Sequence, residues 1–136
     1  IDGWVYWCNS ASNFEYSNDV PPSAGNWSVL LYVGDKIIKT LDTKIKSSIG
    51  QNRYRLSIWA KAKWTNPRGT PETMSLISNG NLRKSIALKD SIWNYYEIVD
   101  TLTMSTTDTL KVRLNSGTAY GYQQTYFDLC RLELLK

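Results

Sequence analysis

The segment from Tyr54 to Trp64 alternates strictly between two kinds of residue, and this alternation constrains the fold more than any other part of the chain. Tyr54, Leu56, Ile58 and Ala60 are spaced two residues apart and suit a buried face. The intervening positions carry polar, cationic or indole side chains: Arg55, Ser57, Trp59, Lys61 and Lys63. Because successive side chains of a strand point to opposite faces, one face suits a core and the other suits solvent or a ligand.

Similar short apolar segments recur along the 136-residue chain, whereas no window keeps a helical apolar spacing for three turns. The pattern predicts about nine strands. They cover residues 3–8, 27–33, 37–45, 54–64, 73–78, 82–88, 92–104, 109–115 and 125–135. Residues 79–81 (Asn-Gly-Asn) are expected to form a hairpin turn, and residues 9–26 a long loop. Short strands separated by turn residues at short intervals are typical of an all-β sandwich or barrel.

Length and composition favour one domain spanning residues 1–136. No repeat, charge run or low-complexity tract divides the chain, and its longest apolar run is too short to cross a bilayer. The net charge of +4 is spread along the sequence without the basic clusters of nucleic-acid-binding proteins. The chain begins at Ile1 without Met, so we expect a processed product or one module of a larger protein, which we place outside the cell or at its surface. Nothing at the start of the chain resembles a signal peptide.

The residues that are missing or scarce exclude several chemistries. The chain has no histidine, which removes histidine-based general base catalysis and most zinc sites. Its two cysteines, Cys8 and Cys130, lie near opposite ends in apolar segments that are expected to be strands. They are consistent either with two buried free thiols or with one disulfide joining the terminal strands.

Trp59 is the first candidate for ligand binding. An indole beside Arg55, Ser57 and Lys61 on an outward face combines a flat apolar ring with hydrogen-bonding groups, which is how proteins hold sugar rings. The alternative is a Trp59 ring that is covered by a neighbouring loop or packed between sheets. Trp64, at the end of the same strand, either lines the rim of a groove or closes the end of the core.

A second group of candidates lies near the end of the chain. Tyr120, Tyr122 and Gln124 are expected in an amphipathic loop that offers stacking faces and hydrogen-bonding groups. Arg113 points outward from its predicted strand and could meet an acidic sugar, provided that this strand shares a sheet with Trp59. By contrast, Trp27 and Trp93 begin strands in apolar surroundings and are assigned to the core.

Four phrases in the expected order resemble the jelly-roll carbohydrate-binding modules, which have a galactose-binding-like β-sandwich. They are the small-Gly segment at residues 24–31, the Tyr-x-hydrophobic-Ser strand at residues 54–62, the Trp93 segment, and the aromatic-Asp closing strand at residues 126–132. The resemblance covers nearly the whole chain. It implies two antiparallel sheets and binding of a polysaccharide or oligosaccharide without catalysis.

The resemblance also has consequences for a metal. Many members of the family hold a structural calcium ion with groups from the opening and closing strands, and Asp128 matches the closing position. The usual opening strand, with its Phe-Glu phrase, is expected to be lacking or to lie outside the chain, since Asp2-Gly3-Trp4 starts the sequence almost at once. Calcium is therefore allowed for but no cofactor is required.

Three functions follow from different readings of the same residues. The first is a non-catalytic module that binds a glycan by aromatic stacking and polar anchoring. The second is a structural or protein-interaction domain that docks neighbouring domains of a surface protein. The third, a hydrolase or lyase on a jelly roll, needs two or more carboxylates, or a Tyr with a basic partner, converging in one cleft, and is the minority reading. None involves nucleic acid or insertion into a membrane.

Overall fold

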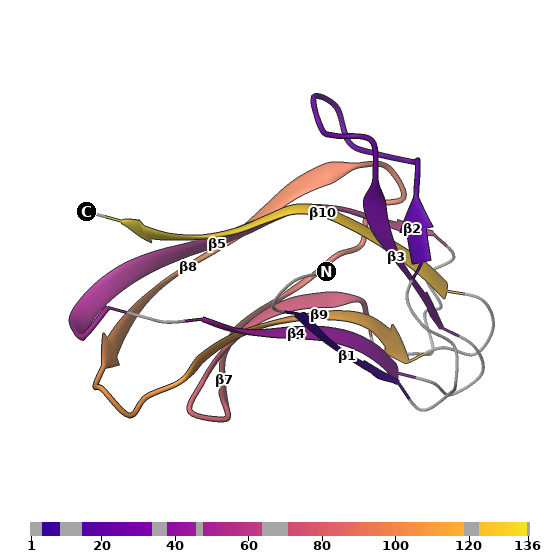
Figure 1. Cartoon of the computed structure of the whole chain (residues 1–136). Helices are drawn as coiled ribbons and strands as arrows, with labels where there is room; N and C mark the ends of the chain where they lie inside the picture. The colour runs from indigo at the N-terminus through magenta and orange to yellow at the C-terminus, as the bar shows by residue number, and fades with distance from the viewer. Residues whose placement is uncertain are drawn as a thin grey trace.

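The computed structural model describes residues 4–8, 15–33, 38–45, 48–63, 71–118 and 123–135. These residues form ten strands in two five-stranded sheets (Figure 1). Sheet A has the order β1-β4-β9-β6-β7. Its strands are β1 (Trp4–Cys8), β4 (Ile38–Ile45), β9 (Leu110–Thr118), β6 (Thr73–Ser78) and β7 (Asn81–Ala87).

Sheet B lies above sheet A in Figure 1 and has the order β2-β3-β10-β5-β8. Its strands are β2 (Glu15–Ser17), β3 (Ser28–Val33), β10 (Gln123–Leu135), β5 (Gly50–Lys63) and β8 (Asn94–Met104). Every pairing in both sheets is antiparallel. The predicted all-β sandwich of two antiparallel sheets is confirmed.

The core fills the space between the two sheets. Sheet B contributes fully buried side chains such as Leu56 and Ile58 from β5, and sheet A contributes Met74, Leu76 and Leu110. The even positions of β5 therefore face the core and its odd positions face outward, as the alternation predicts. Burying such aliphatic side chains stabilises the fold by about 1.5–3 kcal/mol each. The described residues include no helix long and apolar enough to cross a membrane.

Each of the nine predicted strands corresponds to a strand of the structure, and the tenth, β2, was missed. It lies inside the predicted loop at residues 9–26 and pairs with β3. Three residues are too few to show an alternating pattern, so the sequence did not reveal it. Glu15 follows Phe14, which gives the chain a Phe-Glu phrase before the Gly-containing segment. The expectation that this opening strand is lacking is therefore wrong.

Turn chemistry is confirmed at the β6–β7 hairpin. Asn79 and Gly80 both have positive φ, 51° and 76°, as the central residues of a tight hairpin turn require. The Asn79 side chain also ties this turn to the loop before β9. Its Oδ1 accepts a hydrogen bond from the Thr109 amide at 2.8 Å, and its Nδ2 donates to Asp108 at 2.7 Å.

Cys130 has a free thiol, which decides between the two cysteine interpretations for this residue. It lies in β10 and packs against the core. Burial raises the pKa of the thiol to about 12. A disulfide between Cys8 and Cys130 is not formed in this structure.

Candidate functional site

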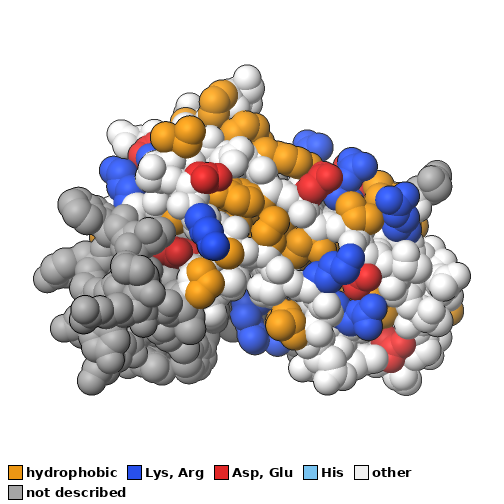
Figure 2. All heavy atoms as spheres, turned by 180° about the vertical axis from the view of Figure 1, so that it is seen from behind, with side chains coloured by type: hydrophobic (Ala, Val, Ile, Leu, Met, Phe, Trp, Pro, Cys, Tyr) orange, Lys and Arg blue, Asp and Glu red, His pale blue; other side chains and the backbone are white. Residues whose placement is uncertain are grey.

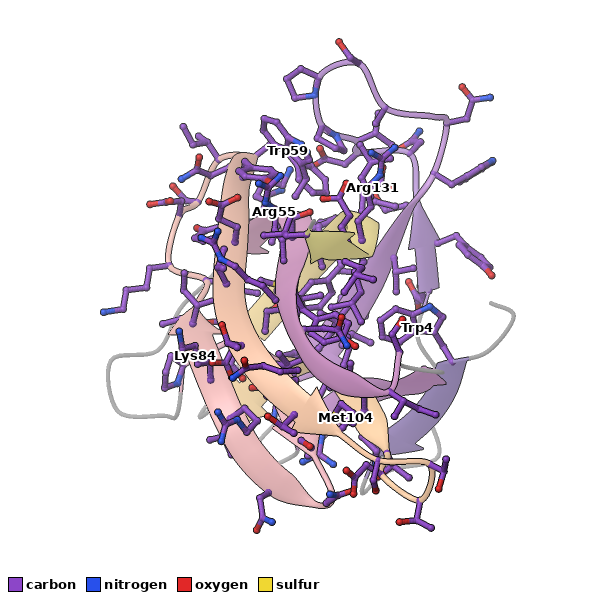
Figure 3. All side chains as sticks on the ribbon, turned by 90° about the vertical axis from the view of Figure 1, so that its left-hand side faces the viewer. Trp4, Arg55, Trp59, Lys84, Met104 and Arg131 are labelled. Carbon is purple, nitrogen blue, oxygen red and sulfur yellow. The ribbon has the colours of Figure 1, made fainter. Side chains whose placement is uncertain are left out.

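The outer face of sheet B carries an open pocket of about 390 Å³ around Trp59. The pocket is lined by side chains from three adjacent strands, β5, β8 and β10: Arg55, Ser57, Trp59, Tyr95, Leu129, Arg131 and Glu133. We call this set the groove. Its volume lies within the range of about 300–1,000 Å³ that is common for small-molecule sites. Trp59, Arg55 and Arg131 lie near one another on the outer side of this sheet (Figure 3).

Strand register explains why these residues meet. Trp59 is paired with Tyr95 of β8, and Ser57 is paired with Arg131 of β10. Paired residues of neighbouring strands share a face at a spacing of about 5 Å, so three strands bring their outward side chains into one row. Ser57, small and only 4% exposed, forms the floor between larger neighbours.

Two aromatic rings form one wall of the groove. Trp59 is half-buried, and Tyr95 is 43% exposed. Their ring centroids are 6.0 Å apart with an interplanar angle of 63°, an edge-to-face contact that holds the indole in one orientation. The Tyr95 hydroxyl donates to Glu97 Oε2 at 3.1 Å, which fixes the second ring as well. The prediction that Trp59 faces outward rather than into the core is confirmed.

Arg55 lies in the groove between two carboxylates. Its guanidinium is 3.6 Å from Glu97 and 3.8 Å from Glu133, and all three side chains are partly exposed. Arg55 Nε is buried and makes no hydrogen bond. The arginine is therefore held by glutamates from both neighbouring strands, and its predicted position beside Trp59 is confirmed.

A β-bulge in β10 shapes the groove from the other side. Asp128 pairs with Trp59 and Arg131 with Ser57, so three steps along β10 match two steps along β5. Leu129 in this bulge has a φ of +51°, which is unusual for a leucine. The extra residue reverses the alternation, and as a result Cys130 faces the core while Arg131 faces outward.

Lys61 occupies a different environment from the one predicted. It points outward from β5, as expected, but it is only 8% exposed. Its ammonium forms an ion pair with Asp19, from the segment between β2 and β3, and lies 4.6 Å from the Tyr126 ring centroid. The Trp93 indole donates to the same carboxylate at 2.9 Å. We call Asp19, Lys61, Trp93 and Tyr126 the closed cluster. The Lys61 ammonium is therefore covered by these side chains and is not open to a ligand.

The Asp19 carboxyl reflects this environment. Burial raises its pKa, but the hydrogen bonds from Lys61 and Trp93 and the charges of Lys61 and Lys63 outweigh that effect. The net result is a pKa below the ordinary value of 3.8. Asp19 is therefore an anionic partner that ties the β2–β3 segment to the outer face of sheet B.

Three of the predicted ligand-binding residues, Trp64, Tyr120 and Tyr122, lie outside the described residues. Gln124 is part of β10 rather than of a loop. It pairs with Lys63, four residues along β5 from Trp59, and it accepts a hydrogen bond from the Tyr126 hydroxyl at 3.4 Å. This places it about 13 Å along the sheet from Trp59, on the far side of the closed cluster.

Arg113 does not share a face with Trp59. Its strand, β9, belongs to sheet A, so the condition under which it was included is not met. It lines a separate polar pocket of about 330 Å³ on the outer face of sheet A, together with Lys111, Asn115 and Ser75.

The two tryptophans assigned to the core also lie elsewhere. Trp27, just before β3, is 62% exposed. It lines a third pocket of about 310 Å³ at the edge of the sandwich, with Trp4 and Tyr16. Trp93 is half-buried on the outer face of sheet B, in edge-to-face contact with Tyr126. Both tryptophans were assigned to the core because their sequence neighbours are apolar, but neither side chain is fully buried in the structure.

Asp128 was the candidate for a structural calcium ion. Its Oδ1 accepts a hydrogen bond from the Leu129 amide at 2.7 Å, and its Oδ2 is buried without a hydrogen bond. That orphaned oxygen could ligate a cation, but calcium takes about six to eight oxygen ligands. Within the described residues no three Asp, Glu, Cys or His side chains gather in one place. Since calcium also binds backbone carbonyl oxygens, the structural calcium ion at Asp128 stays a prediction.

Residues that were not predicted from the sequence complete the groove. Tyr95, Arg131 and Glu133 line it from the strands flanking β5, and each is aligned with an outward residue of β5. Their outward direction on β8 could be found from alternation, but their proximity to Trp59 depends on strand order and on the bulge. Neither the strand order nor the position of the bulge can be predicted from one sequence.

Comparison with solved structures yields several matches over almost the whole chain. The enzymatically active domain of tailspike protein 4 of bacteriophage CBA120 matches with 19% identity and a TM-score of 0.69, covering 98% of this chain and 20% of that chain. TmCBM61 in complex with β-1,4-galactotriose matches with 14% identity and a TM-score of 0.66, covering 98% of this chain and 90% of that chain.

A third match has two kinds of module in one chain. The CBM22-1 and GH10 modules of Clostridium thermocellum xylanase 10B, complexed with xylohexaose, match with 16% identity and a TM-score of 0.61. The alignment covers 99% of this chain and 26% of that one, so the chain spans about a quarter of the xylanase and a fifth of the tailspike. No protein-family model matches the sequence, and no curated protein is significantly similar to it. The structural matches establish that this chain has the β-sandwich fold of carbohydrate-binding modules.

Proposed function

We propose that this protein is a non-catalytic carbohydrate-binding module that holds a polysaccharide or oligosaccharide in the groove on the outer face of sheet B. The observation that carries the proposal is the position of Trp59. Its ring is partly exposed, is held in place by Tyr95, and borders an open pocket that is otherwise lined mainly by polar and charged side chains. This combination suits a ligand with an apolar ring face and polar edges.

The binding mechanism follows from the chemistry of a sugar. One face of a pyranose ring presents C–H groups, which pack against the negative face of an indole. Its hydroxyl groups then need donors and acceptors at the rim, and Arg55, Arg131 and Glu133 supply them. Because the edge-to-face contact already orders Trp59, binding costs little side-chain entropy.

The carboxylates near the groove support binding rather than hydrolysis. Glu97 and Glu133 are both within ion-pair distance of Arg55, which makes them anchors of that arginine. Several solved neighbours carry the name of a carbohydrate-binding module, and two of them contain bound oligosaccharides. The xylanase shows such a module joined to a further module in one chain. We propose the same setting here, in a secreted or surface protein where polysaccharides are found.

The test is affinity electrophoresis of the wild-type chain in gels that contain different neutral and acidic polysaccharides, followed by titration calorimetry with the best ligand. Trp59→Ala should remove most of the retardation, with a loss of affinity of about tenfold or more, since an aromatic platform is a typical hot spot. Trp27→Ala is the matched control, because it deletes an exposed indole outside the groove.

The control also discriminates between sites. Loss of binding in Trp27→Ala together with normal binding in Trp59→Ala would move the ligand to the edge pocket. Absence of binding to every polysaccharide class by the wild type would contradict the proposal. It would favour the second hypothesis, a structural or protein-docking domain.

A further inference from the structure

Arg131 differs from the other arginine of the groove in its partners. Arg55 is flanked by Glu97 and Glu133 at 3.6 and 3.8 Å. Arg131 is exposed and forms no ion pair with any residue in the described ranges. Both guanidinium groups line the same pocket. The groove therefore contains one arginine whose charge is matched and one whose charge is not.

The nearby carboxylates do not compensate Arg131. Glu97 lies on the far side of β5, aligned with Ser57, while Glu133 contacts Arg55. Asp128, before the bulge, accepts a hydrogen bond from the Leu129 amide. Around the groove the charges of Arg55 and Arg131 equal those of Glu97 and Glu133 in number, and the side shown in Figure 2 also mixes basic and acidic side chains. Attraction of an anion into the groove would thus come from Arg131.

The bulge gives Arg131 its orientation. If β10 kept all its residues and alternated regularly from Asp128 onward, Arg131 would point into the core and Cys130 outward. The strand thus adopts a left-handed conformation at Leu129, which is unfavourable for a leucine, and as a consequence a cation faces the groove. Opposite Arg131 stands Ser57, which is small enough to leave the guanidinium accessible from above the sheet.

We propose that the groove selects an acidic glycan, in which the carboxylate of a uronic acid residue pairs with Arg131 while a sugar ring lies against Trp59. This inference rests on the proposed function and names its ligand class. A guanidinium presents donors in a planar fork that matches a carboxylate in a bidentate pair. A sulfate ester offers the same charge with tetrahedral geometry, so the test includes a sulfated polymer as a separate arm.

The experiment uses a matched pair of ligands, a polygalacturonate oligosaccharide and its carboxyl-reduced counterpart with the same linkage and length. Binding of the whole chain is measured by titration calorimetry at low and moderate salt. Three variants are compared with the wild type: Arg131→Gln, Arg53→Gln and Trp59→Ala. Arg53, an exposed residue on the outward face of β5 but outside the groove lining, controls for the change in net charge.

We expect the wild type to prefer the acidic ligand by about tenfold or more, as charged hydrogen bonds are worth that much. Arg131→Gln should abolish this preference and leave binding of the reduced ligand unchanged, whereas Arg53→Gln should keep the preference. Added salt should weaken binding of the acidic ligand only. A clear preference for the sulfated polymer over the polyuronate would overturn the assignment of the carboxylate.

Two results would overturn the inference as a whole: equal affinity of the wild type for both ligands, or equal effects of Arg131→Gln and Arg53→Gln. If Trp59→Ala still removed binding in these cases, the proposed glycan-binding function would stand and only its acidic specificity would fall. Circular dichroism of each variant, with an unchanged spectrum, confirms that a loss of binding is not a loss of fold.

Discussion

Two clusters on the outer face of sheet B are built from the same kinds of residue but have different exposure. The groove combines Trp59 and Tyr95 with two arginines and is open. The closed cluster combines Trp93 and Tyr126 with Lys61, and the β2–β3 segment covers it through Asp19.

Lys61 and Trp59 are two residues apart on one strand, so their faces are identical and only the overlying segment differs. An aromatic and cationic pattern therefore shows which face a residue is on, whereas loop contacts decide whether a ligand can reach it.

The largest effect should come from removing the anion of the closed cluster. Asp19→Ala leaves the buried ammonium of Lys61 without its charged partner, and we expect the free energy of unfolding to fall by about 2–3 kcal/mol. Urea denaturation measures this fall in the free energy of unfolding. Glu133→Ala is the control in the groove, where the ion pair with Arg55 is exposed and worth less than about 1 kcal/mol.

Equal losses in the two variants would contradict the distinction between a closed structural cluster and an open binding groove. In addition, Asp19→Ala should leave the groove side chains in place, so binding of a glycan ligand should persist at a temperature where the variant is folded.

Acid should act on the same cluster with a smaller effect. The pKa of Asp19 is lower in the folded chain than its ordinary value of 3.8, so its stabilising contribution is fully present above that value. The contribution is lost as the pH falls through the lower, folded-state pKa. The free energy of unfolding of the wild type should therefore fall more between pH 6 and pH 2.5 than that of Asp19→Asn. Parallel curves for the two proteins would show that the carboxylate is not engaged.

The sequence predicted the sandwich well because long strands carry a strong alternating signal. β5 has core residues at every second position over half its length, and the Asn79-Gly80 turn has a specific backbone requirement. The same signal placed Trp59 and Arg55 correctly, since both depend only on the face of one strand. The fold of the described residues adds only β2, which is too short to show a period.

The composition of the site was less accessible from sequence. Lys61 was assigned to the ligand because nothing in the alternation reveals that Asp19, 42 residues earlier, covers it. Tyr95 and Arg131 were missed because their contact with Trp59 and Ser57 depends on the order β10-β5-β8. Arg113 was included on the condition that β9 joins the same sheet, and the strand order places it on the opposite one. Nonlocal pairing is the common cause of these errors.

The bulge in β10 gives the smallest effect and the most direct test of how the groove is shaped. Leu129 and Leu134 lie on the same strand and are both 43% exposed, but only Leu129 has a positive φ. Replacement of either by glycine removes the same kind of side chain. Leu129→Gly also relieves an unfavourable backbone conformation, which offsets the loss by about 1 kcal/mol.

Consequently the free energy of unfolding of Leu129→Gly, measured by urea denaturation, should lie within about 0.5 kcal/mol of the wild-type value. That of Leu134→Gly should be lower than the wild-type value by about 1 kcal/mol or more. If both variants lose the same free energy of unfolding, the left-handed leucine is not strained.

Deletion of Leu129 is the complementary change. It removes the extra residue, so Asp128, Cys130 and Arg131 should alternate regularly, with Cys130 still against the core and Arg131 still facing outward. The thiol should therefore stay unreactive toward a maleimide at pH 7, as in the wild type. A thiol that reacts would mean that the shortened strand has shifted its register and turned Cys130 outward.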